Sequence, residues 1–273
     1  MTARSGVRWQ RLTAGSEAAS PPASARRILG IDTSTWTCAV ALLRDGEVRE
    51  ERRERTGSSH AGVLPRLVED VLHAAGETLA AGDAVAVAIG PGSFTGLRIA
   101  LSFAKGFALA GGLRIVGVPT LDALALATPG WEGRLCAALD ARKQEIYAAL
   151  YEREGERIIR LGSPVAITAV RMAEAIDGPC SFIGDAVEAY GDVFRRALGA
   201  AAVLLPSSQY PPSGGAVARL AAARLCREAV GDDLSRLAPA YLRPPEAELT
   251  QSISGPSTAK SALTFVDKVP LVY

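Results

Sequence analysis

The segment RILGIDTSTWTCAVALLRDGEVREERRE, residues 27–54, contains the pattern from which the fold class is predicted. Two short apolar runs, residues 28–32 and 37–43, lie on either side of the polar loop DTST. Asp45-Gly46 then forms a strong hairpin turn signal, because glycine tolerates a positive φ. We therefore expect two antiparallel strands and a third strand after the turn.

The elements that follow are predicted from their apolar period. Apolar residues recur every three or four positions in 60–75 and again in 95–110, which predicts two helices. DAVAVAIG and RIVGVPT indicate buried strands, and LDALALAT a further helix. The order β-β-β-α-β-α-β-α is typical of an α/β fold in which helices pack on a mixed sheet.

A chain of 273 residues can hold two modest domains, and its hydrophobic fraction of 48% is ample for a core. After Trp131 the pattern changes to two strands joined at 140–144, and an Ala-rich helix follows at 215–231. The predicted division is a disordered extension at 1–27, an N-terminal lobe at 28–129 plus 213–246, a smaller second lobe at 130–212 and an appended tail at 247–273.

Composition excludes several classes of protein. Lys and Arg number 30 against 29 Asp and Glu, and this balance argues against a stand-alone nucleic-acid binder with one basic face. The four cysteines are far apart, which suggests buried thiols in a reducing, cytoplasmic compartment. The sequence contains no run of about 18 apolar residues, so no membrane span is predicted. The two histidines form no HxxxH pair, so we predict neither a metal site nor a catalytic residue.

The stretch GPGSFTGLR, which begins at Gly90, has two interpretations. A Walker loop is excluded, because Gly96 is followed by Leu97 rather than by lysine. The favoured interpretation is a tight turn with Ser93 or Thr95 as helix cap. The alternative is an anion site at the helix N-terminus. Together with the DTST loop, that alternative gives a weak nucleotide-binding set of Asp32, Thr33, Ser34, Gly92 and Ser93.

The helix at 95–110 is apolar on two sides. One row contains Leu97, Leu101, Ala104 and Ala108, and the second contains Ile99, Phe103, Phe107 and Ala110. Such a helix is buried on both sides, either within its own chain or against a partner. The helix at 60–75 has a similar excess of apolar residues. The predicted interface set is His60, Leu64, Leu67, Val68, Val71, Ile99, Phe103 and Phe107.

Six segments, in this order along residues 27–246, resemble the bacterial TsaB (YeaZ) family. They are ILGIDTSTWTCAVAL, SSHAGVLPRLVEDVL, AIGPGSFTGLRIALSFAKGFALA, VGVPTLDALA, ALDARKQEIYAALY and PAYLR. The resemblance implies a two-lobed actin-like ATPase (ASKHA, ribonuclease H-like) fold with mixed sheets and a reduced second lobe. It also implies that the helices at 60–75 and 95–110 form the partner surface.

The resemblance further implies a function. Members of the family act as non-catalytic partners of the TsaD transferase, which forms threonylcarbamoyladenosine next to the anticodon of tRNA, and the ATPase TsaE joins them. The resemblance implies that the same surface forms a homodimer when the protein is alone. It also implies that the chain contacts tRNA only indirectly, through the complex. No cofactor is required by this chain, and ATP or ADP is expected only at the partner interface. The alternative is an independent, nucleotide-dependent kinase-like enzyme of the same fold.

Substitution by aspartate can distinguish an interface residue from a core residue. An unpaired carboxylate buried at an interface costs several kcal/mol, which is enough to break micromolar association. We therefore expect Phe103→Asp or Leu67→Asp to abolish association and to leave the monomer folded.

Overall fold

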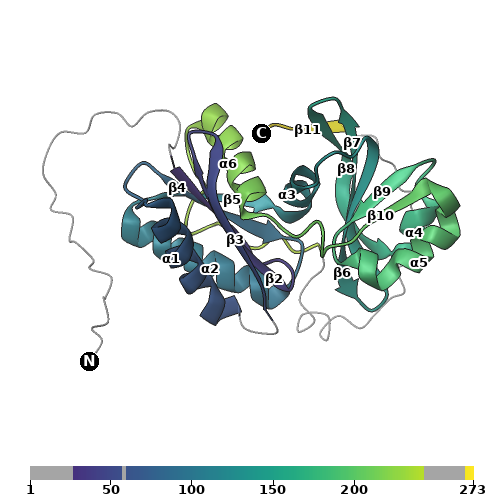
Figure 1. The fold of residues 1–273 in the computed structure, drawn as a ribbon, viewed down its shortest axis with the longest axis horizontal. Helices are drawn as coiled ribbons and strands as arrows, with labels where there is room; N and C mark the ends of the chain where they lie inside the picture. Colours follow the sequence, from purple (N-terminus) through teal and green to yellow (C-terminus); the bar gives the residue numbers. More distant parts are fainter. Residues whose placement is uncertain (1–26, 57–59, 243–267) are drawn as a thin grey trace, which may run out of the picture.

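The computed structural model describes residues 27–56, 60–242 and 268–273 and has two lobes, each built on a mixed sheet (Figure 1). The first lobe and the connection out of it contain β1 (Arg27–Asp32), β2 (Thr37–Arg44), β3 (Glu47–Arg55), α1 (His60–Ala75), β4 (Ala84–Gly90), α2 (Phe94–Gly111), β5 (Arg114–Pro119) and α3 (Thr120–Ala127). The remaining elements are β6 (Gly133–Arg142), β7 (Glu145–Glu154), β8 (Arg157–Thr168), α4 (Ala169–Glu174), β9 (Cys180–Ile183), α5 (Ala186–Leu198), the short 3₁₀ helix η1 (Gly199–Ala201), β10 (Ala202–Leu205), α6 (Gly214–Glu228) and β11 (Lys268–Leu271).

The two lobes repeat one topology. The strand order of the first sheet is β3-β2-β1-β4-β5, and that of the second is β10-β9-β6-β7-β8-β11. In both, the first three strands of the repeat pair antiparallel, whereas the fourth and fifth run parallel to the first. The predicted β-β-β-α-β-α-β-α series therefore occurs twice, and the two-lobed α/β fold with mixed sheets is confirmed.

The first sheet is buried on both faces. The valines Val85 and Val87 of β4 face α1 and α2, while the alternating alanines Ala84 and Ala86 face α6. Small residues on the α6 side let backbones touch: a Cβ added at Gly30 would lie 2.0 Å from a carbonyl oxygen of α6. Because alternate residues of a strand point to opposite faces, the valines of β4 meet one layer of helices and its alanines meet the other.

Helices α3 and α6 end the first and the second repeat. Each crosses over to pack on the sheet of the other repeat, and α3 lies between the lobes (Figure 1). Leu121 and Leu124 of α3 share a core cluster with residues of the second sheet, whereas α6 closes the first sheet. Asp122 of α3 accepts hydrogen bonds from Tyr151 of β7 at 2.8 Å and from Arg160 of β8 at 2.9 Å. The Asp122–Arg160 pair, at 2.8 Å, lies largely out of solvent and ties the connecting helix to the second lobe.

The predicted tail needs a correction. Lys268–Leu271 pairs antiparallel with β8, and Leu271 lies opposite Ile158. These residues therefore extend the second sheet, and the prediction that they belong to an appended tail is wrong. A four-residue strand is too short to show a period, and its partner lies more than a hundred residues away. The predicted extension at 1–27 is wrong for Arg27, which begins β1. Residues 1–26, like the rest of the tail at 247–267, lie outside the described residues.

The second lobe is reduced only in its helical layer. Its sheet has six strands against five in the first lobe. However, α4 and α5 contain 6 and 13 residues, whereas α1 and α2 contain 16 and 18. Among the helices that the structure describes, none is long and apolar enough to cross a bilayer.

Candidate functional site: the outer face of α1 and α2

Helix α1 uses its apolar stripe to cover the first sheet. Four of its predicted interface residues are buried in the core of that lobe, with exposed fractions of 4% or less: Leu64, Leu67, Val68 and Val71. A side chain buried on the sheet has almost no surface left for a partner, although Leu64 still lines the groove described below. The structure therefore corrects the prediction for these four residues and assigns their apolar period to the chain's own core.

Helix α2 presents the two apolar rows that its sequence predicts. Leu97 and Leu101 of the first row are buried against the sheet. Ile99, Phe103 and Phe107 of the second row are only partly buried, and the two phenylalanine rings stack with centroids 5.7 Å apart. This second row is the part of the predicted interface set that remains open to a partner.

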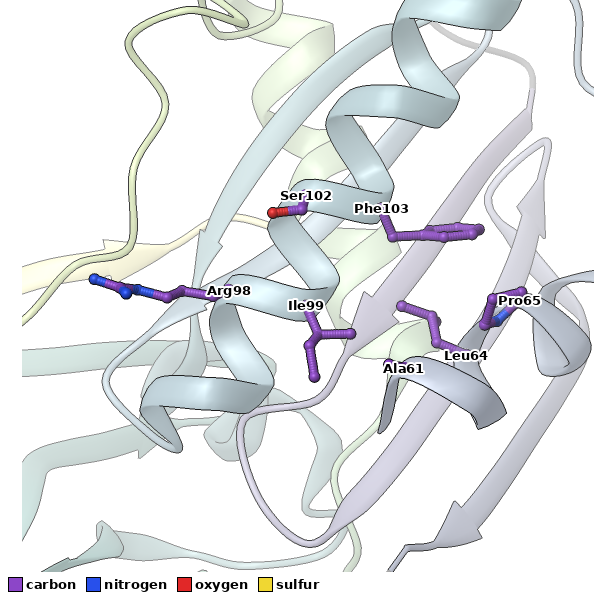
Figure 2. A pocket seen from close by; sticks show the side chains of 7 residues that line it. All are labelled: Ala61, Leu64, Pro65, Arg98, Ile99, Ser102 and Phe103. Atoms are coloured by element: carbon purple, nitrogen blue, oxygen red, sulfur yellow. The ribbon is translucent and has the colours of Figure 1, made fainter. Parts of the chain in front are cut away.

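A groove lies between the two helices beside this row. Its volume is about 360 Å³, and it is lined by Ala61, Leu64, Pro65, Arg98, Ile99, Ser102 and Phe103. Figure 2 shows that Ile99, Phe103 and Leu64 converge between the helices, while Arg98 points to the other side of α2. An apolar groove on a helix pair is suited to accept apolar side chains from another helix.

His60 begins α1 and is buried, with 6% of its surface exposed. Its Nδ1 lies 3.3 Å from the Thr56 hydroxyl, and burial lowers the pKa of the imidazole. His60 therefore joins α1 to the end of β3 and, like the four core residues, is not a surface contact.

The five predicted nucleotide-binding residues lie together, but most of their polar groups bind within the chain. The Thr33 hydroxyl donates to the Gly96 carbonyl at 2.8 Å, and the Ser93 amide donates to the Ser34 carbonyl at 2.7 Å. Asp32 is buried and accepts from the Ser34 amide at 2.8 Å, and burial raises the pKa of its carboxyl.

The glycines of GPGSFTG allow this close contact. A Cβ added at Gly96 would lie 2.0 Å from the Thr33 carbonyl oxygen, and one at Gly92 would lie 2.5 Å from that of Ser34. The Ser93 hydroxyl accepts from the Gly96 amide at 3.2 Å, so the predicted cap is present. These contacts favour the turn interpretation of the stretch over an anion site.

A second polar cluster lies where β6 and β9 end. The Asp185 carboxylate accepts from the Asp140 amide at 2.8 Å, and Tyr190 donates to the Asp140 carboxylate at 3.2 Å. Arg142 pairs with Asp140 at 3.2 Å. Burial, together with the nearby Asp140 charge, raises the pKa of Asp185 to about 6. Within the described ranges, no three His, Cys, Asp or Glu side chains are grouped so that they could hold a metal ion.

Sequence reasoning missed one cluster at the start of α2. The Arg98 guanidinium lies 3.8 Å from the centroid of the Phe94 ring, and its Nε donates to the Tyr241 hydroxyl at 3.0 Å. The two rings stack with centroids 5.3 Å apart. Both GPGSFTGLR and PAYLR stand out in the sequence, but 143 positions separate Arg98 from Tyr241, and neither pattern indicates the contact.

The duplicated sheets, the crossing helices and the helix-lined groove define a two-lobed protein of the actin-like class. A family model described as "TsaD: tRNA N6-adenosine threonylcarbamoyltransferase" matches residues 53–251. The tRNA threonylcarbamoyladenosine biosynthesis protein TsaB of Escherichia coli is 35% identical over 196 residues, which are 67% of this chain and 83% of that protein. The chain belongs to the TsaB (YeaZ) family.

Two further relatives cover more of the chain. TsaB of Bacillus subtilis is 28% identical over 224 residues, which are 81% of this chain and 96% of that protein. The solved structure of YeaZ from Pseudomonas aeruginosa has a TM-score of 0.69 at 31% sequence identity, and the match covers 79% of this chain and 99% of that one.

Proposed function

We propose that this chain is the non-catalytic partner of a TsaD-like transferase in the complex that forms threonylcarbamoyladenosine next to the anticodon of tRNA. The observation that carries the proposal is the partly buried row of Ile99, Phe103 and Phe107 beside the groove. Apolar side chains in a row on a helix are typical of a surface that another helix covers. In this proposal, α2 and the exposed edge of α1 bind the partner.

The relatives support this role. Those from Escherichia coli and Bacillus subtilis are named as threonylcarbamoyladenosine biosynthesis proteins, and the family model is described as the transferase itself. We propose that the chain works in the cytoplasm, that the ATPase TsaE joins the complex, and that tRNA is bound through the complex as a whole.

We also propose that the chain requires no cofactor of its own and that ATP or ADP, when present, lies at the partner interface. The contacts that join the DTST loop to the start of α2 weigh against the alternative of an independent kinase-like enzyme, because polar groups of both segments already bind each other.

The test is the mass in solution of the chain, alone and mixed with the TsaD relative of its organism, measured by light scattering. We expect a homodimer that exchanges into a heterodimer. A monomer that does not respond to the TsaD relative would contradict the proposal, and ATP turnover by the purified chain alone would favour the kinase-like alternative.

A further inference from the structure

The start of α2 contains an arginine that stacks on the Phe94 ring and donates a hydrogen bond to the Tyr241 hydroxyl. We call Phe94, Arg98 and Tyr241 the arginine anchor. Arg98 is exposed, as is 41% of the Phe94 surface. Tyr241 is held in place from behind, because the Ala240 amide donates to the Ile89 carbonyl at 2.7 Å and fixes this segment to the end of β4. The anchor therefore joins two segments that are far apart in the chain.

No carboxylate within the described ranges balances the charge of Arg98. Among the residues that the structure describes, its polar contact is the Tyr241 hydroxyl, and no ion pair involves it. Arg66, the exposed arginine of α1, instead pairs with Asp70 at 3.0 Å and with Glu54. With Nε used by Tyr241, the guanidinium of Arg98 keeps its two terminal NH₂ groups for another acceptor.

The anchor is already ordered for binding. Stacking on Phe94 and the hydrogen bond to Tyr241 restrict a side chain that otherwise has many rotamers. A side chain fixed before binding loses less entropy when a complex forms. The guanidinium edge matches a carboxylate, which it binds through two parallel hydrogen bonds.

The position of the anchor extends the proposed docking surface. Arg98 lines the apolar groove together with Ile99 and Ser102, yet points to the opposite side of α2 from α1 (Figure 2). A protein that covers the exposed face of α2 therefore meets the apolar row on one side and the anchor on the other. A single cation beside an apolar groove fits one carboxylate on a protein better than a nucleic acid, which requires several basic contacts.

We propose that the arginine anchor binds an aspartate or glutamate of the TsaD-like protein that docks on α2. This inference rests on the proposed function, since it assigns a contact within the same interface. It makes Arg98 the residue that sets orientation and specificity, while Ile99, Phe103 and Phe107 supply the apolar area.

The test measures the affinity of the full chain for the purified TsaD relative by calorimetry, at low and high NaCl. We expect Arg98→Gln to weaken binding by about tenfold at low salt and to reduce the salt dependence. Arg98→Lys keeps the charge but loses the two parallel hydrogen bonds of a guanidinium, so its affinity lies between those of the wild type and Arg98→Gln. Tyr241→Phe loosens the guanidinium and gives a smaller loss than Arg98→Gln. Arg195→Gln, on the exposed face of α5 in the second lobe, is the matched control and leaves the affinity unchanged.

The outcomes separate the anchor from the docking surface. Wild-type affinity and wild-type salt dependence in Arg98→Gln, with binding abolished in Phe103→Asp, would overturn the anchor and keep the proposed function. Failure of the wild-type chain to bind the TsaD relative would overturn both. Loss of homodimerisation alone in Arg98→Gln would move the anchor to an interface between copies of this chain. Unchanged thermal midpoints confirm that the variants are folded.

Discussion

Phe103 and Leu67 are apolar residues on adjacent helices, but their surroundings differ. Phe103 is partly buried beside the groove, whereas 4% of the Leu67 surface is exposed within the core. We expect Phe103→Asp to abolish association with the TsaD relative and to leave the monomer folded. Leu67→Asp should unfold the first lobe, because a carboxylate buried without a partner costs several kcal/mol. Circular dichroism of each variant, beside light scattering of the mixture, measures both effects.

The pair of variants also tests the assignment of the apolar rows. A folded Leu67→Asp monomer that no longer associates would contradict the core position of Leu67. An unfolded Phe103→Asp would show that the second row is needed to hold α2 on its own sheet.

Ionisation of Asp185 should make the protein less stable at neutral pH than at pH 4. Its pKa is raised to about 6 in the folded chain, against an ordinary value of 3.8, so the folded state holds the proton more tightly. The free energy of unfolding therefore falls as pH rises from about 4 to about 6, by on the order of 2–3 kcal/mol. Asp185→Asn keeps an acceptor for the Asp140 amide and cannot ionise. We expect it to be more stable than the wild type at pH 7.5 and similar at pH 4, by urea denaturation.

Asp192→Asn in α5, the helix that Asp185 precedes, is the matched control, since this exposed carboxylate should change stability little at either pH. Equal stability of Asp185→Asn and the wild type at pH 7.5 would show that the buried carboxylate is compensated in its charged form.

At the scale of elements, β11 protects the edge of the second sheet. Its four residues pair with β8 from Leu161 to Ile158. A chain ending at residue 267 should lose protection from hydrogen exchange at the β8 amides that face this edge, and its thermal midpoint should fall. A chain ending at residue 271 keeps the strand and is the control. Equal exchange in both truncated chains would mean that β11 contributes nothing measurable to the lobe.

The elements also show what the sequence can predict. The bounds of α1 and α2 agree closely with the predicted helices, because a long apolar period is a strong signal. The period cannot say which neighbour an apolar face meets, so it predicts an interface position for Leu67, which the structure places in the core. The Arg98–Tyr241 contact was missed because the tertiary fold alone brings the two segments together. The role of GPGSFTG as a tight turn was predictable from its missing lysine, although its packing against Thr33 was not.

At the scale of the whole molecule, Asp122 couples the two lobes. It lies on the connecting helix and accepts hydrogen bonds from Tyr151 and Arg160 of the second lobe. We expect Asp122→Asn to cost about 2–3 kcal/mol, because it leaves the partly buried Arg160 guanidinium without its counter-charge. Differential scanning calorimetry should then separate one cooperative transition into two.

The double variant Asp122→Leu/Arg160→Met removes both charges and should recover part of the lost stability. A single unchanged transition in Asp122→Asn would mean that apolar packing of α3 is enough to hold the lobes together.

The crossing of α6 has a consequence for synthesis on the ribosome. When the nascent chain has reached residue 212, β1 to β5 have all been made, but the helix that closes one face of their sheet has not. Ile28, Val116 and Val118 then face solvent while the second lobe is translated as far as β10. The first lobe must therefore wait for the last described helix before its sheet is covered. A product that stops early exposes an apolar sheet that chaperones and proteases recognise.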